Sequence, residues 1–319
     1  MKAKLTIVVP VRNRASVLNR TLESIAAAAR REKVDLILVD NGSTDGSLEI
    51  CSTFVTTHQG DFHRAHVLIE PRRGASVARN RGLEACETEW VYFFDSDDLM
   101  SEDFCEAVCH ELRDHGGELD LLAFPVRMEV DGRIRVKDYE ATARTSVHIL
   151  NSMLCTVAMS MRTTWLREQG GWNEELTTWD DWELGTRLLM AHPRLRWMTQ
   201  RAFHRIIVQE ESQTGASFTD TLAPIVKAMR AVSTDIREAK RMDEKERRSC
   251  EKALYVRARI MAGKLAHEGS SEGRQAFREI AESCLPKASW QMRMRGWLLE
   301  TYSAAGGRGA WRVALIGSM

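Results

Sequence analysis

Apolar residues in the first hundred positions follow two alternating patterns. Continuous apolar runs rich in β-branched residues, such as Lys4–Val11 and Val34–Asp40, are typical of strands buried on both faces. Between these runs, from Ser16 to Lys33, apolar residues recur at the spacing of one helical face. Strands that alternate with helices predict parallel βαβ units and therefore a layered α/β fold. The alternation continues through a strand at Arg64–Glu70, a helix at Gly74–Cys86 and a strand that begins at Trp90.

Shorter elements are predicted after residue 100. A helix with apolar residues on one face follows Ser101, which is expected to be its N-cap. Asp131 and Gly132 are a two-residue turn signal between apolar runs, and they predict a hairpin. Further strand patterns lie within residues 118–126 and 156–161, and a short helix ends at the glycine pair 170–171.

The last third of the chain has a helical and basic pattern. From Thr221 to the end there are 19 Lys and Arg against 11 Asp and Glu, which leaves 26 against 34 for residues 1–220. Helical patterns cover residues 222–240, 244–267 and 289–302, without a convincing strand among them. We therefore expect an α/β domain at residues 1–220 and a basic α-helical region at residues 221–319.

Seven scattered cysteines without a CxxC pair indicate reduced, buried thiols and exclude a zinc site of ordinary ligand spacing. The N-terminal apolar run is too short for a signal peptide, and no run of about 18 apolar residues is present. These features predict a soluble protein, located in the cytoplasm or peripherally at the inner face of the membrane. Nucleic acid is not an expected partner, because the basic excess is moderate and no binding motif accompanies it.

Three carboxylates follow the fourth predicted strand: Asp95, Asp97 and Asp98. Ligands of open α/β sheets gather beyond the C-terminal ends of the strands, where Asp40 also ends a strand. Unpaired carboxylates so close together are costly unless they are solvated or hold a cation. An EF-hand calcium loop is excluded, because counting from Asp95 places Met100 where a glycine is required.

A second acidic group favours a cation over a merely solvated strand end. The segment TTWDDWELGTRLL (177–189) places Asp180, Asp181 and Glu183 just before an apolar helical face. One carboxylate set can hold Mg²⁺ or Mn²⁺ against phosphate oxygens, while the other supplies a general base. The two sets together point to a metal-assisted transfer reaction.

Four segments in this order resemble the family 2 glycosyltransferases, which have the GT-A nucleotide-sugar fold. They are TIVVPVRNR (6–14), LVDNGSTDGS (38–47), GASVARNRGLEACETEWVYFFDSDD (74–98) and GGWNEELTTWDDWELGTRL (170–188). The resemblance leaves the C-terminal third unmatched. It implies a layered, mostly parallel, Rossmann-like sheet with a C-terminal helical extension, a nucleotide-diphosphate sugar donor, and inversion at the anomeric carbon.

The resemblance also implies roles for single residues in donor binding. Pro10, Arg12 and Asn13 match the residues that line the pocket for the base and ribose. Asp40 matches the acid that accepts a hydrogen bond from the base, and Arg79 and Asn80 lie in the motif that flanks the donor site. Asp95 and Asp97 match the DxD motif, in which Asp97 holds Mg²⁺ or Mn²⁺ with Asp95 nearer the ribose and Asp98 in support.

On the acceptor side, Asp181 matches the carboxylate that acts as base in the family, and Asp180 stands where the family has a glutamate. Trp179, Trp182 and Glu183 are expected to contact the acceptor. Tryptophans at such spacing belong to a core as often as to a binding site, so a structural role stays open for both.

One departure from the family concerns the diphosphate contact. A family segment, YRxHxxS, carries a histidine near the metal, and this chain has Gln209 at that position, with Ser212 and Gln213 in register. His204 lies five residues earlier and is expected to be a structural histidine.

The sequence therefore predicts an inverting, metal-dependent glycosyltransferase. It moves a sugar from a nucleotide-diphosphate donor, a UDP-sugar first of all, to a hydroxyl of a saccharide or lipid-linked acceptor in bacterial surface polysaccharide synthesis. Two alternatives stay open. A non-catalytic nucleotide-sugar or glycan-binding protein would lose one acidic set, and a sugar-phosphate nucleotidyltransferase would carry a glycine-rich loop in place of PVRNR (10–14).

The helix at 289–302 combines Trp290, Met294, Trp297 and Leu298 on one face with nearby arginines. Such a face is typical of a helix that lies on a membrane surface, which would give peripheral membrane contact through the C-terminal region. It also suits a helix packed on the catalytic domain or on a second subunit, which is the interpretation we favour here.

Overall fold

The structure is a computed structural model that describes residues 3–130, 133–136, 141–198, 203–207, 217–307, 309–310 and 314. The chain forms two compact units. Unit 1 comprises residues 1–141, 154–177 and 193–209, and unit 2 comprises residues 142–153, 178–192 and 210–319. This division differs from the boundary expected at residue 220, because two short segments from earlier in the chain belong with the C-terminal helices.

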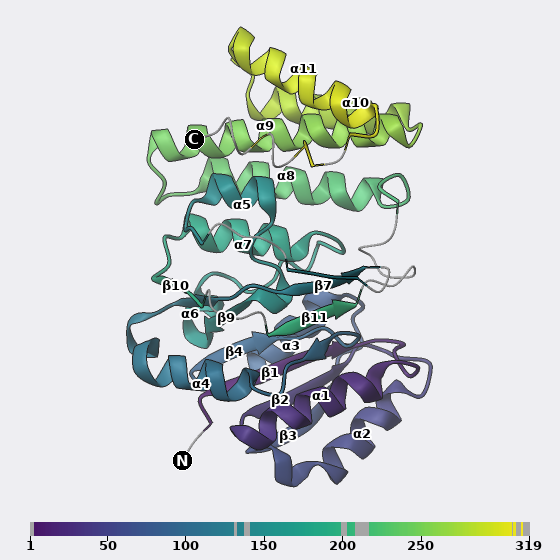
Figure 1. The fold of residues 1–319 in the computed structure, drawn as a ribbon, viewed down its shortest axis with the longest axis vertical. Coiled ribbons are helices and arrows are strands. Elements are labelled where there is room, and N and C mark those ends of the chain that lie inside the picture. The colour runs from purple at the N-terminus through teal and green to yellow at the C-terminus, as the bar shows by residue number, and fades with distance from the viewer. Residues whose placement is uncertain are drawn as a thin grey trace. The chain divides into compact units, whose positions relative to one another are not determined.

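Unit 1 is built on a seven-stranded sheet with the strand order β10-β6-β9-β4-β1-β2-β3. All strands but β9 run in one direction, and β9 is antiparallel to both β4 and β6. The mostly parallel α/β fold predicted from the sequence is thus confirmed (Figure 1). The strands are β1 (Leu5–Val11), β2 (Asp35–Asp40), β3 (Arg64–Ile69), β4 (Trp90–Phe93), β6 (Leu121–Ala123), β9 (Met159–Arg162) and β10 (Leu195–Trp197).

A second, four-stranded sheet of unit 1 has the order β5-β11-β7-β8. Its strands are β5 (Leu99–Met100), β11 (His204–Ile207), β7 (Arg127–Val130) and β8 (Arg133–Val136). β7 and β8 are antiparallel with Val130 opposite Arg133, which confirms the predicted hairpin. Its turn, Asp131-Gly132, lies outside the described residues.

Helices cover both faces of the main sheet. Alternate β1 residues, such as Ile7 and Val9, share a core with α1, whereas Val8 points the other way and meets α3. At Gly82 of α3, a Cβ would lie 2.3 Å from Cγ1 of Val8, so the absence of a side chain allows the close approach. The helices of unit 1 are α1 (Leu18–Arg31), α2 (Ser47–Thr57), α3 (Ala75–Ala85), α4 (Phe104–His115) and α6 (Thr163–Glu168), with 3₁₀ turns at Gln59–Asp61, Gly116–Glu118 and Thr156–Ala158.

Two local predictions in unit 1 are wrong. Ser101 does not cap α4, since the N-cap is Asp103, whose carboxylate accepts the hydrogen bond of the Ser101 hydroxyl instead. The strand expected at 156–161 begins only at Met159, after a 3₁₀ turn. The cysteine prediction is confirmed: all seven are free thiols, and all but Cys155 are buried.

Unit 2 is helical and has its own core, which contains Trp182, Ile225, Tyr255, Phe277 and Leu299. Helix α9 is its centre and packs against α5, α8, α10 and α11, as the upper part of Figure 1 shows. The helices of unit 2 are α5 (Thr145–Asn151), α7 (Asp180–Met190), α8 (Leu222–Glu238), α9 (Glu244–His267), α10 (Ser271–Cys284) and α11 (Trp290–Ala304). No described helix is long and apolar enough to cross a bilayer.

The apolar face of α11 is exposed, with Trp290 68% and Trp297 56% accessible. This face is thus not buried against the described residues of unit 2, and its packing on the α/β domain or on a second subunit stays a prediction. The opposite side of α11 is held by Glu300, which is buried and paired with three arginines at 2.6–2.9 Å, namely Arg259, Arg274 and Arg278.

Candidate functional site

The loops that follow β1, β2 and β4 leave the sheet at the same edge. β1 lies between β2 and β4, with Val11 opposite Asp40 and Val8 opposite Phe93. The chain therefore departs in opposite directions from the two sides of β1, which makes this edge a topological switch point. Such a point is where α/β sheets bind their ligands. All donor-side residues predicted from the sequence lie in unit 1 on or near the elements that meet at this edge.

Asp40 ends β2 and is 2% exposed. Its Oδ2 accepts a hydrogen bond from the backbone N–H of Ser43 at 3.3 Å. Its Oδ1 is buried and has no hydrogen-bond partner in the described part of the chain. Burying a carboxylate oxygen without a hydrogen-bond partner costs free energy. A ligand N–H that donated to Oδ1 would form a charge-assisted hydrogen bond.

The loop after β1 is fastened to the loop after β2 by Asn13. Its Oδ1 accepts from the backbone N–H of Thr44 at 2.8 Å, and its own N–H donates to Ser43 Oγ at 3.2 Å. Asn13 has a φ of +51°, a conformation that asparagine tolerates better than most residues. Pro10 lies opposite Val39 near the end of β1, and Arg12 follows the strand, half-buried.

Arg79 is a buried cation that reaches the DxD segment from α3. It is 6% exposed, and its Nη2 donates to Oδ1 of Asp95 at 3.0 Å. Its guanidinium also stacks over the Trp172 ring, 4.4 Å from the ring centroid. These contacts fix Asp95, and they place a positive charge beside the segment where diphosphate is expected.

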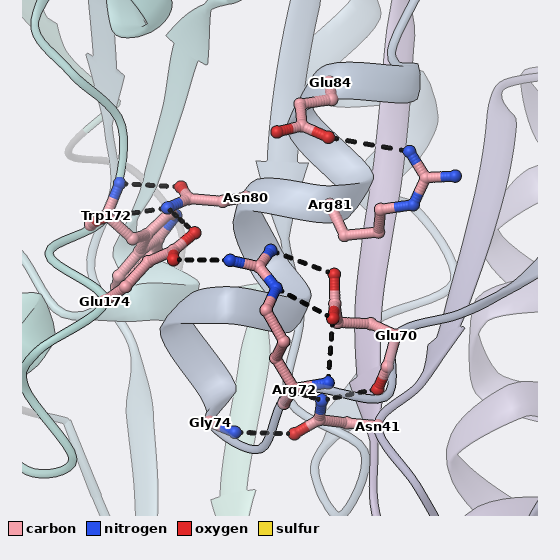
Figure 2. A network of polar contacts seen from close by, with 9 residues as sticks. All are labelled: Asn41, Glu70, Arg72, Gly74, Asn80, Arg81, Glu84, Trp172 and Glu174. Atoms are coloured by element: carbon pink, nitrogen blue, oxygen red, sulfur yellow. Dashed lines mark hydrogen bonds and ion pairs between the residues drawn. The ribbon is translucent and has the colours of Figure 1, made fainter.

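Asn80 has a bracing role in this structure. Figure 2 shows its amide exchanging hydrogen bonds with the backbone of Trp172, at 2.8 and 2.9 Å, and donating to Glu174. In the same network, Arg72 joins Glu174 to Glu70 at the end of β3. The side chain of Asn80 thus ties α3 to the 171–174 loop, so any part that it plays in donor binding is indirect.

Asp97 lies in the most strongly charged part of the rim. Burial and the negative charge of Asp95 raise the pKa of its carboxyl, while Arg14 and Arg20 oppose the shift. The Nε of Arg14 lies 3.5 Å from Oδ2 of Asp97, and Arg20 donates to its backbone carbonyl at 3.5 Å. Neither arginine could be assigned to the site from the sequence, because nothing in their spacing distinguishes them from other surface cations.

The carboxylate pair fits the divalent cation that the family implies. Carboxylate oxygens are the ligands that Mg²⁺ and Mn²⁺ prefer, and a cation would relieve the repulsion that raises the pKa of Asp97. Two carboxylates leave the remaining ligand positions to substrate phosphates and water, as is usual for Mg²⁺. Within the described residues, no group of three or more His, Cys, Asp or Glu side chains is arranged to hold a metal.

His204 is a structural residue, as predicted. It is 1% exposed in a cluster of aromatic rings, and its Nε2 lies 2.9 Å from the hydroxyl of Tyr92. Burial lowers its pKa to about 3, so the ring stays neutral. Gln209, Ser212 and Gln213 lie outside the described residues.

The acceptor-side carboxylates belong to unit 2. Asp180 and Asp181 open α7 and are both half-buried. The residue before them, Trp179, has a φ of +56°, a left-handed conformation that is rare for a bulky residue. Such strain is maintained only where surrounding contacts determine it.

Arg257 of α9 supplies those contacts. Its guanidinium lies 4.4 Å from the ring centroid of Trp179 and 4.5 Å from that of Trp182, and it donates to the carbonyl of Ile149 at 2.8 Å. Burial lowers its pKa to about 9, against the opposing effect of the Asp181 charge. Arg257 is therefore a buried cation that positions the WDDW segment. No local sequence pattern marks Arg257, because its partners lie more than 70 positions away.

Two of the three expected acceptor contacts are corrected by the structure. Trp182 is 2% exposed in the core of unit 2, and its Nε1 donates to Ile149. Glu183 is 1% exposed and paired with Arg187 at 2.6 Å; it also holds a hydrogen bond with Asp235, whose pKa burial and the Glu183 charge raise to about 7. The polar groups of both side chains already have partners within unit 2, whereas Trp179 is half-buried and stays a candidate acceptor contact.

The mostly parallel seven-stranded sheet, with its switch point beside β1 and helices on both faces, is an α/β fold of the GT-A type. The chain belongs to glycosyl transferase family 2, because the model described as "Glycosyl transferase family 2" matches residues 6–169.

Curated relatives agree with this membership. The chain is 31% identical over 208 residues to the pre-mycofactocin glycosyltransferase of Mycobacterium tuberculosis, a match that covers 60% of this chain and 40% of that protein. It is 30% identical over 148 residues to the minor teichoic acid biosynthesis protein GgaB of Bacillus subtilis, covering 46% of this chain and 15% of GgaB. The chain thus matches less than half the length of either relative.

Solved structures show the same fold. TarS 1–349 of S. aureus in complex with UDP-GlcNAc superposes with a TM-score of 0.73 at 19% identity, covering 98% of this chain and 90% of that one. The mannosyltransferase PcManGT of Pyrobaculum calidifontis, in complex with GDP-Man and Mn²⁺, gives a TM-score of 0.55 at 17% identity, covering all of this chain and 84% of that one.

Proposed function

We propose that this chain is an inverting glycosyltransferase that moves a sugar from a UDP-sugar to a hydroxyl of a saccharide or lipid-linked acceptor in bacterial surface glycan synthesis. The observation that carries the proposal is the unpartnered, buried Oδ1 of Asp40 on the same rim as the DxD pair. The names of the relatives support it, since one acts in teichoic acid synthesis and the TarS structure holds UDP-GlcNAc.

On the donor side, Asp40 accepts a hydrogen bond from an N–H of the base, which uracil offers. Pro10, Arg12 and Asn13 line the base and ribose pocket, and Asp95, held by Arg79, contacts the ribose. Asp97 and Asp95 would hold Mg²⁺ or Mn²⁺, which when bound neutralises charge on the leaving diphosphate. Arg79 adds positive charge from the protein itself.

On the acceptor side, Asp181 takes the proton of the attacking hydroxyl, with Asp180 beside it at the start of α7. The acceptor oxygen forms a bond to the anomeric carbon while the bond to the diphosphate oxygen breaks, and the bonding electron pair leaves with the nucleotide. Attack from the side opposite the leaving group inverts the anomeric centre. Arg257 positions this segment by holding Trp179.

The donor half is tested by calorimetric titration with UDP-, GDP-, CMP- and dTDP-sugars, each with Mn²⁺ and with chelator. We expect Mn²⁺-dependent binding of the UDP-sugar, weakened roughly 10- to 100-fold in Asp40→Asn, because one charge-assisted hydrogen bond is worth about 1.5–3 kcal/mol. Asp97→Ala is expected to lose the dependence on Mn²⁺. Asp35→Asn is the matched control, since Asp35 lies at the other end of β2 and pairs with His63.

Failure of every nucleotide to bind would overturn the proposal in favour of a non-catalytic protein. The catalytic half is tested separately with Asp181→Asn, which should bind donor as the unaltered protein does but release no nucleotide in the presence of acceptor mixtures. Full turnover by that variant would assign the base elsewhere, with Asp180 the next candidate.

A further inference from the structure

Unit 2 has a surface cavity of about 460 Å³ whose lining combines basic, hydroxyl and apolar residues, the last being Leu150, Ala253, Val256 and Met292, and includes no acid. Three elements form it: α5, α9 and α11. The basic groups are Lys245, Arg248 and Lys252 of α9 and Arg295 of α11, with the hydroxyls of Ser146 and Ser249 between them. A cavity of this size and charge suits an anionic group with several oxygen acceptors.

The basic row of α9 has three cations and one nearby acid, Glu251, on which the charge of Arg248 acts. Lys245, Arg248 and Lys252 recur three and four residues apart, so they share one helical face, and like charges at this spacing repel one another. None of the three forms an ion pair with another described residue. The nearby acid of α9, Glu251, instead lines a different cavity beside Cys284. The row therefore presents unbalanced positive charge to the cavity.

Arg295 joins this cavity to the exposed face of α11. It donates to the carbonyl of Ala314, and partial burial lowers its pKa, so its guanidinium is already partly withdrawn from water. At 3.6 residues per turn, Arg295 lies roughly 60° around the helix from Leu298 and roughly 20° from Tyr302. Both of these side chains are exposed, so the cavity borders the apolar face directly.

The exposed face of α11 has the composition of a membrane-interface helix. It consists of Trp290, Met294, Trp297, Leu298 and Tyr302, each between 45% and 68% exposed. Glu300, the one acid of α11, is buried among its three arginines and contributes no negative charge to that face. Tryptophan and tyrosine favour the head-group region of a bilayer, where their rings are apolar and their polar edges are hydrated.

We propose that unit 2 docks on an anionic lipid surface: the cavity takes the phosphate of a lipid head group, and the exposed face of α11 lies among the head groups. Charge complementarity favours an anionic lipid surface as the partner of the α11 face, because the exposed aromatic side chains of α11 adjoin the cations of the cavity near Arg295. This inference is independent of the proposed sugar transfer, and its failure would leave the nucleotide-binding results unaffected.

Vesicle co-sedimentation of the full chain tests the proposal, with vesicles of phosphatidylcholine alone and of equal parts phosphatidylcholine and phosphatidylglycerol. We expect binding to the anionic vesicles only, weakened roughly 30-fold in the double variant Arg248→Ala, Lys252→Ala, since each cation near such a surface contributes about a fivefold effect. Arg230→Ala with Lys240→Ala, which removes the same charge outside the cavity, is the control. Leu298→Ser should also weaken binding, whereas Ile69→Ser, an equally exposed apolar residue of unit 1, should not.

Three results would overturn the proposal. If the cavity variant and its charge-matched control lost vesicle binding equally, the binding would depend on net charge and not on the cavity. If the protein bound inorganic pyrophosphate at the cavity but bound no vesicles, the ligand of the cavity would be a soluble anion. A concentration-dependent dimer that Leu298→Ser abolishes, again without vesicle binding, would assign the face of α11 to a second copy of the chain.

Discussion

At the scale of single residues, Asp97 is subject to opposite demands from folding and from binding. Burial and the charge of Asp95 raise its pKa, so the folded protein holds its ionised form at a cost. A carboxyl whose pKa is raised on folding favours the folded state at low pH, and this contribution is lost as the pH rises through the raised value. A divalent cation needs the ionised form, which is the form that folding disfavours.

We therefore expect Asp97→Asn to raise the melting temperature at pH 7, while abolishing Mn²⁺-dependent donor binding. The gain should shrink as the pH falls through the raised pKa of Asp97, because the carboxyl of the unaltered protein then becomes protonated. Thermal melts between pH 4 and 8 measure both.

Asp45→Asn is the control with the opposite sign. The pKa of Asp45 is lowered, chiefly by the Ser47 hydroxyl, so its ionised form stabilises the fold and its loss should lower the melting temperature above pH 4. A gain from Asp97→Asn that did not change with pH would refute the account of Asp97.

At the scale of elements, the contact of α3 with β1 sets how closely the Arg79-bearing helix approaches the sheet. It depends on Gly82, where any side chain would collide with Val8 of a strand buried on both faces. Gly82→Ala should therefore destabilise the protein by about 1–3 kcal/mol, despite the better helix propensity of alanine. Chemical denaturation measures the change, and Gly60→Ala, where a Cβ meets nothing within 4 Å, should stay within about 0.5 kcal/mol. Equal effects at the two positions would contradict the close approach.

The link from α9 to the WDDW segment gives another prediction. Arg257→Met removes the cation between Trp179 and Trp182, and it removes one of the two side-chain hydrogen bonds to the Ile149 carbonyl. We expect a loss of about 2–4 kcal/mol in stability and at least a tenfold fall in turnover, with donor affinity unchanged.

Arg257→Lys separates the two effects, because it keeps the charge but not the planar stacking. It should recover part of the stability and less of the turnover. Stability and turnover that recovered to the same degree would leave Arg257 with a purely structural role.

Elements with strong periodicity were predictable from the sequence, whereas those defined by tertiary contacts were not. The strands of unit 1 from Leu5 to Phe93 contain long apolar runs, and their order along the chain indicated a parallel sheet. Strands β5, β10 and β11 have only two to four residues each and exist through their pairing partners. Helix α10 escaped notice because charged and small residues interrupt its apolar positions.

Site residues divided in the same manner. Carboxylates such as Asp40 and Asp97 could be proposed as site residues from local sequence, because they lie at or shortly after the ends of apolar strands. The bracing role of Asn80 and the burial of Trp182 depend on partners distant in sequence, at Trp172 and Ile149. Local pattern does not distinguish a side chain that faces a ligand from one that faces a neighbouring loop.

At the scale of the whole molecule, the division into units makes transfer by the proposed mechanism depend on the C-terminal helices. The segment 178–192, which carries Asp180 and Asp181, forms its core with α8 and α9 and belongs to unit 2. A chain that ends at residue 220 should therefore keep nucleotide binding, which depends on unit 1, and lose transfer. Nucleotide titration and turnover assays on this truncated chain measure the two effects. Transfer at the normal rate would show that α7 holds its geometry without α9.

The same arrangement has a consequence for synthesis on the ribosome. Segment 178–192 emerges before α9, whose last residue is His267, so 75 residues separate the acidic segment from the end of the helix that holds Arg257. At about 5–20 residues per second, that delay is roughly 4–15 s. During this interval the nascent chain exposes Trp182 and its apolar neighbours without their core, which is the condition under which chaperones bind. A chain released early would therefore carry all four segments that resemble the family and still lack an ordered acidic segment.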